Sequence, residues 1–253
     1  MISRKKLADD LKAFFFMQDS ITAVWESGSA ATGWLDENSD MDIAVICDDG
    51  REEPLLAELD RYLEANYGID KRHRVPEPAW HGFTQCFYRI KDTPELFYLD
   101  ICFIKKSSPD KFTDTDRHGI PVIWFSRDEL PVFEPSSREA VKKRGKKLYE
   151  TVAGTDFLIL TELKKAIRRG IYAEAFVNYF QVVRGLSVLM NLKYRPEKAD
   201  FGLRYACRDY PEKEYEFIVN ALKISSLEDI IKKLAGVQGR FNALKTALEN
   251  EWA

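Results

Sequence analysis

The spacing of apolar residues changes near residue 135, and this change constrains the fold more than any other feature of the sequence. Before it, short apolar runs alternate with turn-forming residues, which predicts strands. After it, apolar residues recur at steps of three and four over 155–169, 173–192 and 227–252, which predicts helices. We therefore expect an α+β domain over residues 1–135 and a helical bundle over 136–253.

The first 135 residues contain enough strand signals for a mixed sheet with flanking helices. Apolar residues at helical spacing predict helices over 7–17 and 54–67, and a small polar segment over 27–39 predicts a loop or a short helix. Runs rich in β-branched and aromatic residues predict strands over 21–25, 41–47, 83–90, 96–104 and 121–125. The runs at 83–90 and 96–104 are expected to pair as antiparallel neighbours.

Composition and charge exclude several classes of protein. The chain has 38 basic and 41 acidic residues and a net charge of −3, which disfavours a nucleic-acid partner. No apolar run approaches the ~18 residues that span a bilayer, and the charged N-terminus is not a signal peptide. The four cysteines form no CxxC pair, so we expect neither a zinc nor a haem site. These features favour a cytoplasmic protein.

Three aspartates are the strongest candidates for chemistry. Asp40 and Asp42 stand two residues apart at the start of the apolar run 41–47, so both carboxylates face the same way if the strand begins there. Asp100 interrupts the apolar run 96–104, and an ionised carboxylate inside a core strand requires a partner. Oxygen ligands of this kind suit Mg²⁺. If the two strands are neighbours, the three carboxylates can bind one or two Mg²⁺ ions.

A glycine-serine turn precedes the acidic pair. Gly28 and Ser29 come shortly after the predicted strand 21–25, which ends near Glu26. Glycine lets the backbone approach a phosphate closely, and free N–H groups at the start of a short helix would face the same anion. The hydroxyls of Ser29 and Ser39 can add hydrogen bonds. We expect Gly28, Ser29 and Ser39 to bind the phosphates of a nucleotide.

The order of these motifs resembles the polymerase-β-type nucleotidyltransferase superfamily. Gly28-Ser29, ten residues, then Asp40-x-Asp42 before an apolar strand, with Asp100 on a later strand, is similar to the signature of that superfamily. The helical second half resembles bacterial aminoglycoside and lincosamide nucleotidyltransferases. The resemblance implies a nucleotidyltransferase domain over 1–135 and a helical substrate-binding domain over 136–253.

The resemblance also implies a reaction. The enzyme would transfer a nucleoside monophosphate from ATP or another NTP to a hydroxyl of a small-molecule acceptor, such as an aminoglycoside or lincosamide antibiotic. Asp40, Asp42 and Asp100 would hold Mg²⁺, and Asp100 would act as the general base. Members of the superfamily often carry Arg at the positions of Ala30 and Thr32, and a basic group of the helical half, among Lys164, Lys165, Arg168 and Arg169, would have to replace them. A homodimer is compatible with this interpretation.

Two alternatives stay open at this point. The acceptor could be a protein or an RNA, as in nucleotidyltransferases of toxin–antitoxin pairs, although the near-neutral charge weighs against RNA. The chain could also be a non-catalytic nucleotide-binding module of the same fold, and the missing arginines keep that alternative open. The sequence does not choose the acceptor or the nucleotide.

Overall fold

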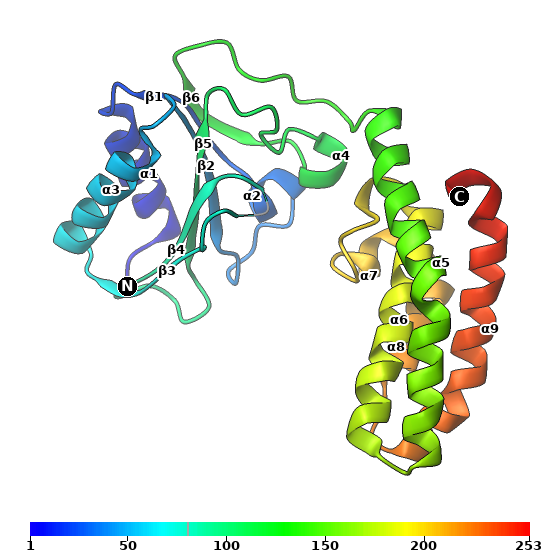
Figure 1. The fold of residues 1–253 in the computed structure, drawn as a ribbon. Coiled ribbons are helices and arrows are strands. Elements are labelled where there is room, and N and C mark those ends of the chain that lie inside the picture. Colours follow the sequence, from blue (N-terminus) through cyan, green and yellow to red (C-terminus); the bar gives the residue numbers. More distant parts are fainter. Residues whose placement is uncertain (80) are drawn as a thin grey trace. The chain divides into compact units, whose positions relative to one another are not determined.

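The computed structural model describes residues 1–79 and 81–253. The chain divides into two compact units, Met1–Pro135 and Ser136–Ala253, which are coloured blue to green and green to red in Figure 1. Each unit has its own hydrophobic core. The units are therefore described one at a time.

The first unit is built on a six-stranded sheet with the order β3-β4-β5-β2-β1-β6. Its strands are β1 (Ile21–Glu26), β2 (Met41–Cys47), β3 (Ile69–Arg74), β4 (Thr84–Ile90), β5 (Leu99–Lys105) and β6 (Val122–Ser126). The central pair β2 and β5 is parallel, and the other neighbours are antiparallel. The predicted α+β class with a mixed sheet and flanking helices is confirmed.

Two helices cover one face of this sheet (Figure 1). They are α1 (Arg4–Phe16) and α3 (Glu52–Asn66). Their buried leucines, together with Phe15, pack on alternate residues of the central strands, among them Ile43 and Ile101. Burial of one such side chain contributes about 2 kcal/mol, which orients β2 and β5 with these residues toward the helices. Asp42 and Asp100 then face the opposite side because strand side chains alternate.

The opposite face carries a smaller cluster that includes Trp25, Ala44 and Ile104. Phe112 and Phe133, from the segment that follows β5, pack against this cluster. The same face bears two short helices, α2 (Gly28–Thr32) and α4 (Thr115–His118). The backbone N–H of Ile120 donates to the carbonyl of Ala31 at 3.0 Å, which fixes the end of α4 against α2.

The second unit is helical from its first turn onward. It consists of α5 (Arg138–Arg168), α6 (Tyr172–Tyr194), the 3-10 turn η1 (Pro196–Lys198), α7 (Ala206–Asp209), α8 (Glu212–Leu222) and α9 (Leu227–Trp252). The long helices α5, α6 and α9 share one core. Ser226 and Asp229 form a reciprocal capping box at the start of α9. Across the residues described, no helix is both long and apolar enough to cross a membrane.

Candidate active site

Asp42 on β2 and Asp100 on β5 lie directly opposite each other. They are partners in the parallel register of the two strands, so their Cα atoms stand about 4.8 Å apart. Paired residues of parallel strands point to the same face, which here is the face without α1 and α3. The two side chains therefore start from neighbouring positions on one face of the sheet.

The carboxylate of Asp100 is largely buried and is held by an amide. Gln85 of β4 donates from Nε2 to Oδ1 at 2.7 Å and to Oδ2 at 2.9 Å. Burial raises the pKa of Asp100 from 3.8 to about 6, the hydrogen bond from Gln85 lowers it, and the nearby charge of Asp40 raises it. An acid with a pKa near 6 is ionised at neutral pH and can accept a proton.

Asp40 adjoins the pair from the residue before β2. Burial raises the pKa of Tyr98, and so do a hydrogen bond to Asp40 and the charges of Asp40, Asp42 and Asp100. One phenol therefore lies within the electrostatic reach of all three carboxylates. Neither Asp40 nor Asp100 forms an ion pair with a Lys, Arg or His side chain of the described chain.

A partly buried ion pair fixes the backbone at Asp40. Arg4 of α1 donates from Nη2 to Oε1 of Glu26 and, at 2.9 Å, to the carbonyl of Asp40. Glu26 is buried at the end of β1. Sequence reasoning treated Glu26 as a strand-end residue and did not identify Arg4, because the contact joins positions 22 residues apart.

Gly28 and Ser29 form the first turn of α2 beside Asp42. Gly28 has a φ of +58°, and a Cβ atom there would lie 1.7 Å from Oδ2 of Asp42. Only glycine fits this approach. Oγ of Ser29 is buried and has no hydrogen-bond partner among the described residues. A buried hydroxyl without a partner costs about 1–3 kcal/mol, which a bound ligand would recover.

The remaining predicted phosphate ligand has a different environment. The hydroxyl of Ser39 donates to Oδ1 of Asp36 at 2.8 Å, and it accepts from the backbone N–H of Asp36 at 2.9 Å. It thus orders the 36–39 turn, and its phosphate role stays a prediction. The hydroxyl of Thr32 donates to the carbonyl of Gly28 at 3.0 Å, so Thr32 stabilises α2 without adding positive charge.

The donor set of this face fits a hard divalent cation. Carboxylate and hydroxyl oxygens predominate, and these are the ligands that Mg²⁺ prefers. Among the described residues, no group of three or more His, Cys, Asp or Glu side chains is arranged as a preformed metal site. Joint binding of a metal by Asp40, Asp42 and Asp100 therefore stays a prediction.

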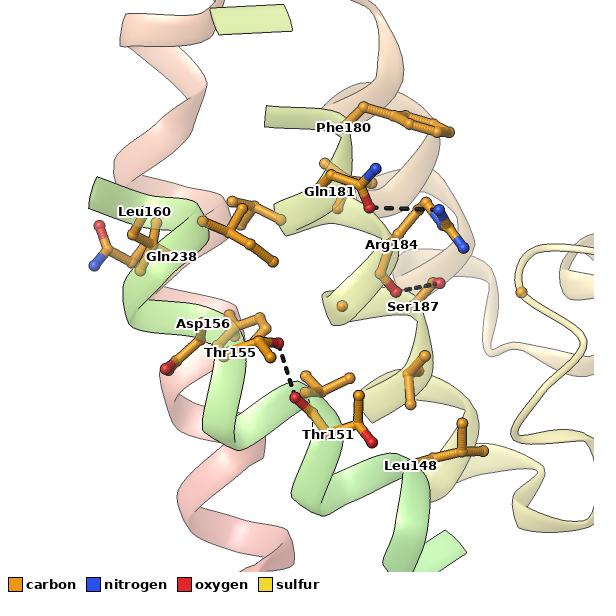
Figure 2. Close-up of a pocket in the computed structure, with 18 of the residues that line it drawn as sticks. Leu148, Thr151, Thr155, Asp156, Leu160, Phe180, Gln181, Arg184, Ser187 and Gln238 are labelled. Carbon is orange, nitrogen blue, oxygen red and sulfur yellow. Dashed lines mark hydrogen bonds between the residues drawn. The ribbon is translucent and has the colours of Figure 1, made fainter. Parts of the chain in front are cut away.

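The helical unit contains a separate cavity of about 550 Å³. It lies among α5, α6 and α9, with apolar walls that include Val152, Leu160 and Phe241. Figure 2 shows Thr151 and Thr155 of α5 and Arg184 and Ser187 of α6 at its sides. The hydroxyls of Thr151, Thr155 and Ser187 donate to backbone carbonyls, so toward a ligand they can only accept.

Comparisons with known proteins give remote structural likeness alone. No protein-family model matches the chain, and no curated protein matches it. One similar structure is a nucleotidyltransferase-like protein from Exiguobacterium sibiricum 255-15, with a TM-score of 0.41, 12% identity, and coverage of 94% of this chain and 73% of that one.

Two further structures are similar at the same level. Spectinomycin adenyltransferase AAD(9) from Enterococcus faecialis, solved with ATP and spectinomycin, has a TM-score of 0.37 and 11% identity over 98% of this chain and 100% of that one. Cid1 poly(U) polymerase, solved with Mg 3′-dATP, has a TM-score of 0.31 and 14% identity over 76% of this chain and 51% of that one. The predicted resemblance to nucleotidyltransferases recurs here, but at such low scores it carries no argument about this chain's activity, substrate or cofactor.

Proposed function

We propose that the chain is a Mg²⁺-dependent nucleotidyltransferase. It transfers a nucleoside monophosphate, with AMP from ATP as the favoured case, to a hydroxyl of a small-molecule acceptor. One observation carries the proposal. Paired aspartates at positions 42 and 100 face the same side of the sheet, next to the glycine-serine turn whose Ser29 hydroxyl is buried without a partner. Carboxylate oxygens that can bind a hard cation and a buried hydroxyl that has no partner are the two halves of a Mg-nucleotide site.

Each residue has a defined task in this proposal. Asp40, Asp42 and Asp100 would hold Mg²⁺, and the phosphates would lie against Gly28 and Ser29. Bound Mg²⁺ would neutralise charge that develops on the phosphates. Asp100 accepts the proton of the acceptor hydroxyl. The new bond joins the acceptor oxygen to the α-phosphorus, and the bond from the α-phosphorus to the pyrophosphate oxygen breaks.

We assign acceptor binding to the helical unit. Its cavity of about 550 Å³ is within the range of small-molecule sites. Wall hydroxyls that only accept hydrogen bonds suit an acceptor rich in N–H and O–H donors. Replacing Val188, which lines the cavity, with Trp should raise the KM of the acceptor at least several-fold and leave the affinity for Mg-ATP unchanged.

Two measurements test the assignment. Isothermal titration with Mg-ATP should give saturable binding, and pyrophosphate release should depend on an acceptor from a panel of aminoglycosides and lincosamides. Asp42→Asn should abolish release, whereas Asp48→Asn, at the exposed far end of β2, should leave it unchanged. Binding without release for any acceptor, protein and RNA included, would favour the non-catalytic alternative. Absence of Mg-ATP binding would refute the proposal.

A further inference from the structure

A chain of hydrogen bonds leads from Asp100 to a backbone amide at the start of β4. Gln85 donates to both oxygens of Asp100 at 2.7 and 2.9 Å. Oε1 of Gln85 lies 3.1 Å from Nε2 of His81. The backbone N–H of Phe83 donates to Nδ1 of His81 at 3.0 Å. One continuous path therefore connects Phe83, His81, Gln85 and Asp100.

The backbone end of this path determines the direction of every bond in it. A backbone N–H can only donate, so Nδ1 of His81 must carry a lone pair and Nε2 must carry the proton. That proton points at Gln85 and requires its carbonyl oxygen there. The NH₂ group of Gln85 is then directed at Asp100. If the amide turned over, its oxygen would face a carboxylate and an N–H would face the Nε2–H of His81.

Ring packing holds His81 in this orientation. The centroid of its ring lies 5.1 Å from that of Phe83 and 6.1 Å from that of Phe112. Phe83 belongs to the cluster on the sheet face that bears Asp42 and Asp100, and Phe112 packs against that cluster. The imidazole is therefore oriented by apolar contacts as well as by hydrogen bonds.

We propose that His81 and Gln85 are positioning residues that fix the orientation of the Asp100 carboxylate for metal binding and for proton acceptance. This inference rests on the proposed function. Gln85 uses one lone pair on each oxygen and leaves the others for a cation or for the acceptor proton. Partners of this kind around metal-binding carboxylates typically change affinity or activity by ~10–100-fold when removed.

The test compares Gln85→Leu, His81→Phe and the double variant. His81→Phe keeps the ring and removes both hydrogen bonds. The matched control is His73→Phe on β3, whose ring stacks on Phe87 at 6.2 Å. Calorimetric titration with Mn²⁺ and no nucleotide measures the site directly, and melting in EDTA verifies that each variant is folded.

We expect each single variant to weaken Mn²⁺ binding by ~10–100-fold and to lower kcat without changing the KM for ATP. The double variant should be no weaker than Gln85→Leu, since the two residues act in series. His73→Phe should bind as the wild type does. Mn²⁺ affinities within twofold of wild type in both single variants, or losses that multiply in the double variant, would overturn the inference.

A second readout separates this inference from the proposed function. Imidazole ¹⁵N shifts of the metal-free wild type should place the His81 proton on Nε2, and Gln85→Leu should remove its hydrogen bond. A wild type that binds no Mn²⁺ would refute the proposed function, and the ¹⁵N spectrum would still decide whether the chain to Asp100 exists. A proton on Nδ1 would overturn the inference by itself.

Discussion

Two residues at the centre of the site have environments that a typical strand or helix residue does not tolerate. Asp100 places a carboxylate among the apolar residues of β5, and Gly28 places backbone where a side chain would collide with Asp42. The buried carboxylate of Asp100 costs stability in the unliganded chain. Such costs are typical of functional positions because a ligand can offset them.

Gly28→Ala should abolish Mg-ATP binding. The added Cβ would lie 1.7 Å from Oδ2 of Asp42, so Asp42 or the turn must move, and the positive φ adds about 1–2 kcal/mol of strain. Gly50→Ala is the control, since its φ is +81° with no atom within 4 Å of the added Cβ. Gly50→Ala should lose stability from the backbone strain alone and should bind Mg-ATP as the wild type does. Equal nucleotide binding by wild type and Gly28→Ala in calorimetry would contradict the phosphate assignment.

The raised pKa of Asp100 predicts a pH dependence of stability in EDTA. As pH rises from 3.8 toward about 6, the unfolded chain loses the proton of Asp100 while the folded protein keeps it. The folded state then binds more protons, so stability falls over this interval. The loss should reach up to about 2 kcal/mol after allowance for partial solvation.

Urea unfolding of Asp100→Asn measures this effect. The variant should lack the decline and should exceed the wild type in stability at about pH 8 but not at about pH 4. The exposed Asp19→Asn should follow the wild type at both pH values. A wild-type curve that rises between these pH values, with Asp100→Asn parallel to it, would rule out the raised pKa.

At the scale of elements, apolar periodicity predicts the central strands well and the edges poorly. Two apolar runs that each contain one carboxylate predict the strands of Asp42 and Asp100, but only the structure shows that these strands are neighbours. Strand β3 was missed because Ile69 is its one apolar residue, since an exposed edge strand needs no buried face. Gln85 lies on the same sheet face as Asp100. Predicting that contact requires the register of β4 on β5, which a single sequence does not encode locally.

The start of α5 was also misplaced for a physical reason. Sequence periodicity indicated a helix from residue 155, whereas the helix begins at Arg138 after the cap Ser137. The basic residues at 142–147 and the glycines at 145 and 154 conceal the apolar stripe of the first turns. Gly145 is present because Trp252 of α9 packs directly on it, a contact between helices that no local pattern reveals.

The two glycines of α5 should respond oppositely to the same substitution. A Cβ at Gly145 would lie 2.2 Å from Cζ3 of Trp252, whereas one at Gly154 meets no atom within 4 Å. Gly145→Ala should therefore lower the free energy of unfolding by about 1–3 kcal/mol. Gly154→Ala should raise it by about 0.5–1 kcal/mol through helix propensity. Chemical denaturation followed by helical circular dichroism measures both, and stabilisation by Gly145→Ala would contradict the packing.

At the scale of the whole molecule, the hydrophobic cores separate by unit. The sheet unit buries its side chains in two clusters on the faces of one sheet, and the helical unit buries its own among the helices from Tyr149 to Trp252. Separate cores imply cooperative units that unfold with their own free energies. The division of tasks proposed above, with the nucleotide on one unit and the acceptor on the other, then predicts which unit each ligand stabilises.

Differential scanning calorimetry should resolve two transitions that respond to different changes. Leu59→Ala, in the core between the sheet and its helices, should destabilise the sheet unit by about 2–5 kcal/mol. Gly145→Ala should lower the transition temperature of the helical unit alone. Mg-ATP at about 100 times its Kd should stabilise the first by about 2.7 kcal/mol and leave the second unchanged, because a ligand stabilises only the unit that binds it. If either variant shifted both transitions equally, the chain would unfold as one cooperative unit. If Mg-ATP stabilised only the transition of the helical unit, the assignment of the nucleotide site to the sheet unit would be wrong.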